Sequence, residues 1–413
     1  MALETLTVQC CVVGGGPAGV MLGYLLARAG VDVVVLEKHD DFFRDFRGDT
    51  IHPSTLELMR ELGVLEAFLR LPHQHATTVG VRFGEFEATV ADFTHLPTHC
   101  KFLALMPQWD FLDFLARLGT RYRTFALRMG TEATGIIEDD GRVAGVRAET
   151  AGGPLEIRAD LVGAADGRHS TIRKAAGFEV DVLGAPMDVL WFRLPREPAD
   201  PRRLTFFIAS GCLLIMIDRG DYWQMGYVIP KDGLEALKAA GMELFCRALT
   251  HTAPFLGART AALRSWDEVK LLSVRVDRLR RWFRPGLLCI GDAAHAMSPV
   301  GGVGVNLAVQ DAVATANILA DALKHGGATP NHLAAVQRRR AFPARVTQKV
   351  QVAIQDTIIG PLLASTGPLK PPLAIRLLHR IPLLQRLPAR FIGIGARPEH
   401  VTGAEDAAAR VTS

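Results

Sequence analysis

Near the start of the chain, apolar residues occur in uninterrupted runs rather than alternating with polar ones. Residues 8–37 open with an apolar run, pass through a cluster of glycines, continue with helical spacing to Arg28, and end in a second apolar run before Glu37. Short uninterrupted apolar runs bounded by turn residues are typical of strands buried on both faces of a parallel sheet. The pattern therefore predicts a strand–helix–strand unit.

A different period governs residues 183–230. Apolar and polar residues alternate in steps of two over 188–194, 204–209, 212–218 and 222–229. Residues 78–93 alternate in the same way around Gly84-Glu85. A period of two with tight turns predicts antiparallel strands. We therefore expect a second, antiparallel layer distinct from the parallel unit.

Composition narrows the class of protein. The 413 residues are 49% hydrophobic and 22% charged, and the net charge of +4 is too small to argue for nucleic acid. Six cysteines lack CxxC or histidine-spaced patterns, so neither a disulfide framework nor a metal site is expected. Residues 8–27 could mimic a membrane span, but their glycines and proline are placed as a turn, and we expect a cytoplasmic protein.

The glycines after the first strand have the spacing of a dinucleotide-binding turn. Gly14, Gly16 and Gly19 form GxGxxG, and Glu37 follows at about the distance where an acid accepts ribose hydroxyls. Each glycine has a purpose, since the turn is tight, the backbone must approach a pyrophosphate, and the helix must pack on the strand. The helix N-terminus adds unpaired N–H groups and positive charge. We expect an adenine dinucleotide here.

Two later strands run into loops of similar character. The strand 159–164 is followed by Asp166-Gly167, and the strand 287–290 by Gly291-Asp292. Loops at the carboxyl ends of parallel strands are where open α/β sheets bind ligands. Earlier in the chain, near residue 53, we expect a helix capped by Ser54, with His52 at its start lacking a partner.

Three motifs together resemble the group A FAD-dependent monooxygenases, the p-hydroxybenzoate hydroxylase-like aromatic-ring hydroxylases. They are GGGPAG at 14–19, DLVGAADGRHSTIRKAAG at 160–177 and RPGLLCIGDAAHAMSPVGGVGVNLAVQDA at 284–312. The resemblance covers roughly residues 5–345. It implies that FAD is held by Gly14, Gly16, Pro17, Ala18, Gly19, Glu37, Lys38, Arg47, Gln108, Asp166, Gly167, Asp292, Pro299, Gly302, Gly304, Val305 and Asn306.

The resemblance also implies a fold and its division into domains. The fold is α/β: a Rossmann-type FAD-binding domain with a βαβ unit and a parallel sheet, an antiparallel-sheet substrate domain, and a helical C-terminal tail. We expect the FAD-binding domain to comprise residues 1–72, 100–180 and 268–345. The substrate-binding domain would then comprise 73–99 and 181–267, and the helical segment 346–413.

The implied reaction is hydroxylation of an apolar or aromatic substrate (a phenol, a quinone or a polyketide-like compound) by O2 through a flavin C4a-hydroperoxide. Because the chain has a single GxGxxG, NADPH or NADH would be a transient co-substrate. No acid–base residue is assigned, and the pocket candidates are Tyr222, Gln224 and Pro299. Alternation places Tyr222 and Gln224 on one face and Trp223 and Tyr227 on the other, without indicating which face meets the flavin.

Other functions are weighed against this one. The main alternative is a flavoenzyme of the geranylgeranyl-reductase type, which reduces double bonds without inserting oxygen. A flavin-dependent halogenase is disfavoured because its WxWxIP signature is absent, the nearest match being WQMGYVIP at 223–230. A non-enzymatic flavin sensor lacks any recognisable addition for binding nucleic acid.

The tail leaves two interpretations open. Between residues 366 and 400 lie six Lys or Arg against one acid, with leucines interleaved and prolines repeated. The first interpretation is a set of short helices packed on the FAD-binding domain or on a dimer partner. The second is peripheral contact with a membrane surface. A monomer and a homodimer are both compatible with the sequence.

Overall fold

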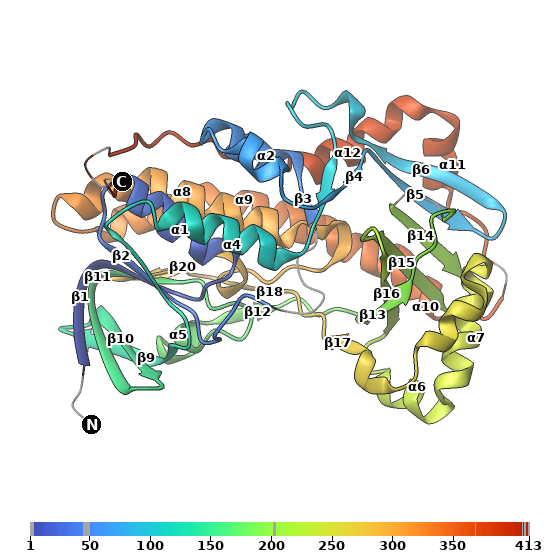
Figure 1. Cartoon of the computed structure of the whole chain (residues 1–413), viewed down its shortest axis with the longest axis horizontal. Coiled ribbons are helices and arrows are strands. Elements are labelled where there is room, and N and C mark those ends of the chain that lie inside the picture. Colours follow the sequence, from blue (N-terminus) through green and yellow to red (C-terminus); the bar gives the residue numbers. More distant parts are fainter. Residues whose placement is uncertain are drawn as a thin grey trace.

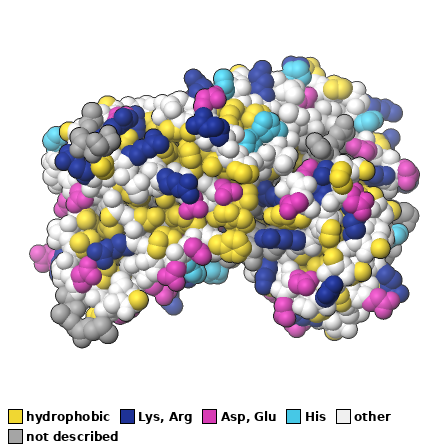
Figure 2. All heavy atoms as spheres, in the orientation of Figure 1, with side chains coloured by type: hydrophobic (Ala, Val, Ile, Leu, Met, Phe, Trp, Pro, Cys, Tyr) yellow, Lys and Arg dark blue, Asp and Glu magenta, His cyan; other side chains and the backbone are white. Residues whose placement is uncertain are grey.

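The computed structural model describes residues 4–43, 50–200, 204–367, 369–406, 408 and 410–411. Arg47, expected to contact the cofactor, lies outside the described residues. Two large sheets occupy opposite ends of the molecule and long helices run between them (Figure 1). Charged side chains of both signs are interspersed over the face seen in Figure 2, and hydrophobic ones gather along its middle.

The first sheet has eight strands, with the order β19-β20-β11-β1-β2-β8 and the β9–β10 hairpin joined through β11. Its strands are β1 (Glu4–Val13), β2 (Val33–Leu36), β8 (Phe125–Arg128), β9 (Glu132–Asp139), β10 (Arg142–Thr150), β11 (Gly153–Ala164), β19 (Phe283–Arg284) and β20 (Leu287–Cys289). β1 runs parallel to both β2 and β11, and β11 runs parallel to β20. The predicted strand–helix–strand unit is confirmed.

The second sheet has seven strands in the order β17-β13-β16-β15-β14-β5-β6. They are β5 (Thr78–Phe83), β6 (Phe86–Asp92), β13 (Met187–Pro195), β14 (Leu204–Ala209), β15 (Cys212–Asp218), β16 (Tyr222–Pro230) and β17 (Lys270–Leu272). All neighbours are antiparallel except β14 and β5. Segments 78–92 and 187–230 thus share one sheet, to which β17 adds residues 270–272. The division of the chain into domains stays a prediction.

Smaller sheets and the helices complete the description. The small strands are β3 (Thr50–Ile51), β4 (Gln74–Ala76), β7 (Leu103–Leu105), β12 (Val180–Val182) and β18 (Asp277–Leu279). The α-helices are α1 (Pro17–Arg28), α2 (Pro53–Glu61), α3 (Leu65–Leu69), α4 (Gln108–Gly119), α5 (Thr171–Ala175), α6 (Leu234–Ala240), α7 (Met242–Thr252), α8 (Gly304–Lys324), α9 (Pro330–Ile354), α10 (Gly360–Leu363), α11 (Leu373–Arg380) and α12 (Arg386–Gly393). Short 3₁₀ turns are η1 (Phe93–His95), η2 (Pro254–Ala262), η3 (Trp266–Glu268), η4 (Gly291–Ala293), η5 (Val300–Gly302) and η7 (Pro382–Gln385), and η6 (Gln355–Ile359) is a π-helix.

Helix α8 is the central helix of the Rossmann-type half. It packs against α1 and α9 on one side of the first sheet (Figure 1). The segment Val300–Lys324 is long and apolar enough to cross a membrane, but 72% of its most apolar stretch is buried within the protein. An apolar helix buried to this degree is typical of a protein core.

Asn306 on α8 ties the start of α2 to this core. Its amide oxygen accepts hydrogen bonds from His52 N–H (2.8 Å) and Thr55 Oγ1 (2.8 Å), and its Nδ2 donates to the carbonyl of Thr50 (3.0 Å). The helix begins at Pro53 with His52 in the capping position, so the expected cap at Ser54 is wrong.

His52 was expected to lack a partner, and this too is wrong. Its Nδ1 donates to the carbonyl of Ile392 at 2.8 Å, since a carbonyl can only accept. Its Nε2 is buried with no hydrogen-bond partner among the described residues. Burial lowers the pKa of His52 to about 4, although the Ile392 carbonyl opposes the shift. The ring is therefore held neutral.

The C-terminal tail contacts both halves of the molecule. Helices α11 and α12 pack on β6, and α10 packs on β15 and β16, so these helices cover the second sheet. Helix α12 also contacts the start of α2, through the hydrogen bond from His52 to Ile392. The last residues return along the first half, where Asp406 N–H donates to Arg28 O (2.8 Å) and Val411 N–H to Arg121 O (2.7 Å). The tail therefore straps both halves.

A buried ionic network anchors this strap. Asp311 on α8 accepts from Arg340 Nε at 2.8 Å and from His295 Nε2 at 2.6 Å. Arg340 Nη1 also donates to Glu399 Oε1 at 3.0 Å, and Arg340 is fully buried. Burial alone would raise the pKa of Asp311, but His295 and Arg340 together lower it below its usual value.

We predict that Glu399→Gln destabilises the protein by about 3 kcal/mol, because it removes one partner of a buried charge pair. Arg340 would then keep only Asp311 for its charge. The shift of the urea midpoint of the full chain measures the effect. Glu235→Gln, which removes an exposed pair to Lys238, is the control and should cost less than about 0.5 kcal/mol. Equal shifts for the two variants would contradict the prediction.

A second prediction concerns pH. The folded protein keeps His52 neutral down to about pH 4, whereas in the unfolded chain its imidazole binds a proton near its ordinary pKa of 6.5. The stabilisation is therefore complete above about pH 6.5 and is lost as pH falls toward 4, at up to about 1.4 kcal/mol per pH unit. The free energy of unfolding should decline less steeply between about pH 7 and 5 in His52→Gln. Parallel declines would show that His52 does not contribute.

Candidate functional site

The candidate site lies where four strands of the first sheet end. Gly14 N–H donates to Leu36 O at the end of β2 (2.8 Å), and Ala165 N–H donates to Val13 O at the end of β1 (2.8 Å). Ile290 N–H donates to Ala164 O at the end of β11 (2.9 Å). The predicted loops at Gly14, Glu37, Asp166 and Asp292 therefore meet at one edge, as parallel strand pairing requires.

The glycine turn is built from close backbone contacts. A Cβ on Gly19 would lie 1.8 Å from the carbonyl oxygen of Gly14, so only glycine lets α1 approach β1 here. Gly14 itself has a φ of +105°. In contrast, a Cβ on Gly16 would meet nothing within 4 Å. The glycine turn therefore packs tightly against the sheet but leaves open space in front of the N-terminus of α1. Pro17 and Ala18 begin this helix, and no side chain caps it.

Glu37 lies beside this turn. Its Oε2 accepts from Gly15 N–H (3.1 Å) and its Oε1 from His39 N–H (3.0 Å). The carboxylate is thus held next to the glycines at the end of β2, where it can accept hydrogen bonds from hydroxyl groups of a ligand. Lys38, by contrast, is exposed.

Asp166 lies at this edge shortly after β11. Its Oδ2 accepts from Ile172 N–H at 3.1 Å, while its Oδ1 is buried with no hydrogen-bond partner among the described residues. Burial raises the pKa of Asp166, opposed by hydrogen bonds from Ser170 and backbone N–H groups. Gly167 beside it has a φ of +80° and open space at its Cβ position. An unpaired buried acceptor next to open space fits a donor from a ligand.

Asp292 follows β20 and pairs with Arg168, whose Nη2 lies 3.3 Å from its Oδ2. A third residue, Arg173, braces the two loops from within. It donates to the carbonyls of Arg168 (2.6 Å) and Ala293 (3.2 Å), and the fully buried Asp277 balances its charge. Sequence reasoning missed Arg173, because nothing in the pattern of α5 marks its side chain as buried.

A second group of predicted residues lies at the N-terminus of α8. A Cβ on Gly302 would lie 2.4 Å from Thr50 Oγ1, and Thr50 Oγ1 donates to Gly302 O at 3.2 Å. Gly304 and Val305 form the first turn of α8, which no side chain caps. The amide of Asn306 is engaged within the protein, so only its backbone is available to a ligand. The site here is a backbone surface.

The two groups are joined through Gly291. A Cβ at this position would lie 3.1 Å from the Cβ of Ala18 on α1 and 3.3 Å from the Cβ of Ala308 on α8. The loop that carries Asp292 is therefore wedged between the two helices. Gln108, another predicted residue, opens α4 shortly after β7, which pairs with β3.

A ladder of glutamines supports the loop of Pro299, and sequence reasoning missed it. Gln351 accepts from Ser298 N–H (3.1 Å) and donates to the carbonyls of Ser298 (2.9 Å) and Val300 (2.8 Å). Gln348 donates to Ala296 O (3.0 Å), and Gln355 donates to Ser298 Oγ (2.9 Å). All three glutamines are buried. Their spacing along one helical face was the available signal.

The second sheet turns one face toward this loop. Trp223 and Tyr227 pack with Phe245 of α7 on the outer face. Val228 and Trp191, on the other face, share an apolar cluster with Val300. Alternation places Gln224 and Tyr222 on this inner face; Gln224 is 3% exposed and accepts from Arg219 Nε at 3.0 Å.

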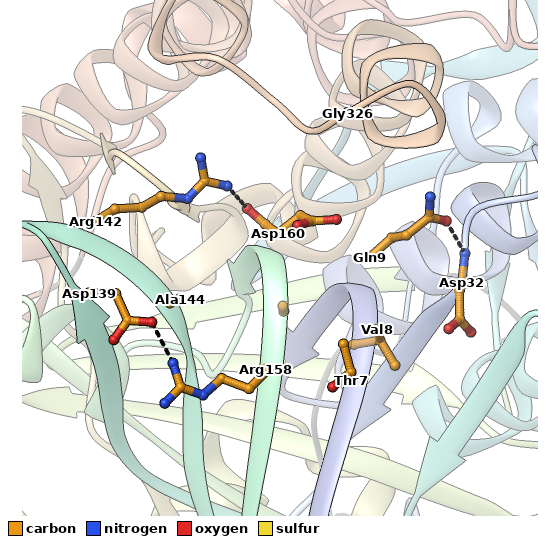
Figure 3. Close-up of a pocket in the computed structure, with 11 residues that line it drawn as sticks. Thr7, Val8, Gln9, Asp32, Asp139, Arg142, Ala144, Arg158, Asp160 and Gly326 are labelled. Carbon is orange, nitrogen blue, oxygen red and sulfur yellow. Dashed lines mark hydrogen bonds and ion pairs between the residues drawn. The ribbon is translucent and has the colours of Figure 1, made fainter.

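A hollow of about 490 Å³ elsewhere in the molecule is a poor rival (Figure 3). It lies beside the middle of β1 and of β11, away from the glycine turn, and is open to solvent. Its arginines are already engaged, Arg158 with Asp139 (2.5 Å) and Arg142 with the carbonyl of Asp160. Among the described residues no cluster of His, Cys, Asp or Glu could hold a metal, and all six cysteines are free.

The residues present fit a bound FAD. Open space at Gly16 and Gly167, two helix N-termini without side-chain caps, and the unpaired Oδ1 of Asp166 suit an anionic dinucleotide with hydroxyl donors. These features occur where the sequence motifs predicted them.

Known proteins are similar to this chain over most of its length. The 6-methylpretetramide 4-monooxygenase of Streptomyces rimosus is 36% identical over 348 residues, which cover 83% of this chain and 82% of the relative. The rifampicin monooxygenase of Streptomyces venezuelae is 30% identical over 313 residues, covering 73% and 61%. The structure of p-nitrophenol 4-monooxygenase PnpA from Pseudomonas putida DLL-E4 has a TM-score of 0.76 at 22% identity, covering 96% and 100%, and shows the same fold.

Residues 7–350 match the family described as FAD binding domain. The named relatives are monooxygenases, which favours oxygen insertion over the alternative of double-bond reduction. The chain belongs to the FAD binding domain family and is an FAD-dependent monooxygenase of the group A, aromatic-ring hydroxylase type.

Proposed function

We propose that this monooxygenase hydroxylates a flat, apolar aromatic compound of the phenol, quinone or polyketide type, bound between the loop of Pro299 and the inner face of the second sheet. The observation that supports this most is the composition of that face. Across β13, β16 and β15 it presents Val189, Trp191, Val228, Leu213 and Ile217, all buried. Such a surface favours an apolar ring over a small dianion.

The polar groups on this face are few. Gln224 is buried, and Tyr222 lies at the start of β16 with the guanidinium of Arg193 4.9 Å from the centre of its ring. A mostly apolar pocket with a few placed polar groups fixes the orientation of a ligand. The relatives whose names specify 6-methylpretetramide and rifampicin as substrates are consistent with a large ring system.

FAD, when bound, supplies the redox chemistry and the activation of O2, and the protein supplies binding, orientation and exclusion of water. We assign the pyrophosphate to Gly14, Gly16, Pro17, Ala18 and Gly19, and the adenosine ribose to Glu37 with Lys38 alongside. Asp166, Gly167 and Asp292 would hold the ribityl region, and the resemblance assigns Gln108 and Arg47 to the pyrophosphate or ribityl region. Pro299, Gly302, Gly304, Val305 and the backbone of Asn306 would lie along the flavin ring, where the N-terminus of α8 favours negative charge.

NADPH or NADH would be a visitor rather than a resident. The chain contains a single GxGxxG, and its glycine turn is assigned to FAD. A transient encounter at the protein surface therefore accounts for flavin reduction. A cytoplasmic location, where both nicotinamides and free thiols occur, is supported by the six free cysteines.

The function is tested by turnover of a panel of phenols, quinones and polyketide-like aromatics. We expect at least one to accelerate NAD(P)H oxidation and to yield product carrying one oxygen atom from labelled O2, with the second atom released as water. Rapid mixing should show flavin reduction by NADPH or NADH. Failure of both nicotinamides to reduce the flavin with every compound present, or turnover that proceeds without oxygen, would overturn the proposal.

Gln351→Leu should weaken FAD binding at least tenfold, which corresponds to about 1.4 kcal/mol. The substitution leaves three backbone groups of the Pro299 loop without their hydrogen-bond partner. Fluorescence titration of the apoprotein with FAD measures the change in Kd.

Gln337→Leu is the matched control on the same helix. Gln337 also forms hydrogen bonds with backbone groups, but with groups outside the loop of Pro299. It accepts from Trp282 N–H (3.1 Å) and donates to Arg280 O (2.9 Å). It should lower stability while leaving the Kd for FAD near that of the parent protein. An equal rise in Kd for both variants would mean that Gln351 acts only through general stability.

A further inference from the structure

The helices α11 and α12 leave an unusual surface uncovered. Five aliphatic side chains within residues 373–387 are exposed: Leu373 (78%), Leu377 (45%), Ile381 (44%), Leu383 (61%) and Leu387 (65%). The other large exposed hydrophobic residues in the described parts of the chain are scattered over six separate segments. Single exposed leucines are ordinary, but a cluster of this size marks an interaction site.

The exposed side chains form stripes on one side of these elements. Leu373, Leu377 and Ile381 follow a spacing of four, so they share a face of α11 and its end. The opposite face is engaged, since Ile375 is buried and the ring of His379 lies 5.2 Å from that of Phe86 on β6. The apolar stripe is therefore held outward by packing of the helix on the sheet.

The charge around the stripes has a single sign. Between Asp356 and Glu399 the sequence contains no acid, whereas it contains Lys370, Arg376, Arg380, Arg386, Arg390 and Arg397. Arg376, Arg380, Arg386 and Arg390 are exposed, and none makes an ion pair with a described acid. The surface therefore combines exposed aliphatic groups with uncompensated positive charge.

We propose that this leucine–arginine face, formed by residues 370–390, docks on a bilayer of anionic lipids. Aliphatic side chains enter the boundary between headgroups and acyl chains, and arginines meet lipid phosphates. A second copy of the chain fits less well, because a two-fold interface places the same patch against itself and would bring two acid-free basic surfaces together.

The docking face is built from two short helices rather than one long one. Prolines at 371, 372, 382 and 388 prevent one long amphipathic helix, the usual element for such docking. Here α11, η7 and α12 contact one another in succession, and both helices pack on β6. Figure 1 labels both helices in the upper right part of the molecule, close to β6. Two short helices on a rigid sheet thus replace one long helix.

Flotation of the full-length FAD-loaded protein with lipid vesicles tests the proposal. We expect binding to vesicles that mix phosphatidylcholine with phosphatidylglycerol, little binding to pure phosphatidylcholine, and release by salt. The triple variant Leu373→Ser, Leu377→Ser, Leu387→Ser should bind at least tenfold more weakly. Its side chains are already exposed, so FAD content and NAD(P)H oxidation should remain those of the parent.

The pair Leu244→Ser, Leu271→Ser is the control. These leucines are 48% and 45% exposed on other elements, and their removal should leave vesicle binding unchanged. Absence of binding to anionic vesicles, or equal losses in both sets of variants, would overturn the proposal. Concentration-dependent self-association of the free protein that only the triple variant abolishes would assign the face to a second copy instead.

Discussion

Asp311 is the residue on which the separate parts of this structure depend. Its carboxylate is fully buried and accepts from Gly291 N–H (3.1 Å), His295 and Arg340. A buried charge is tolerated only when oppositely charged and hydrogen-bonding partners are placed at the right distance and direction around it. The loop that carries Asp292, helix α8, helix α9 and, through Glu399, the tail must therefore all be in place together.

The cofactor loops are held by side chains that bond backbone carbonyls. Arg173 grips the loops after β11 and β20, the glutamines of α9 grip residues 296–300, and Asn306 grips Thr50 and His52. Such contacts set the position of the backbone while leaving its open side free. The backbone atoms and helix ends that would contact a ligand are therefore already in position. Binding of the ligand then costs little free energy of reorganisation.

Motif-based predictions succeeded where a local pattern has one structural solution. The turn at Gly14, the hairpin around Gly84 and the strands of 188–229 appear as expected, because periodicity and turn chemistry are local properties. Predictions about partners did worse. His52 has a carbonyl partner from Ile392, which lies 340 residues away in the sequence. Ser54 does not cap α2, because the helix already begins at Pro53 and His52 occupies the capping position.

The sequence by itself determined the parallel unit, the dinucleotide turn and the identity of the loops at Asp166 and Asp292, since glycine spacing and strand–loop order are written locally. Only the tertiary structure decided that the Gln224 face of β16 looks toward the Pro299 loop, that Arg173 and Gln351 hold the loops, and that the leucines of α11 point outward. Alternation specifies two faces but not which one is covered. That choice is made by the packing of distant helices against the sheet.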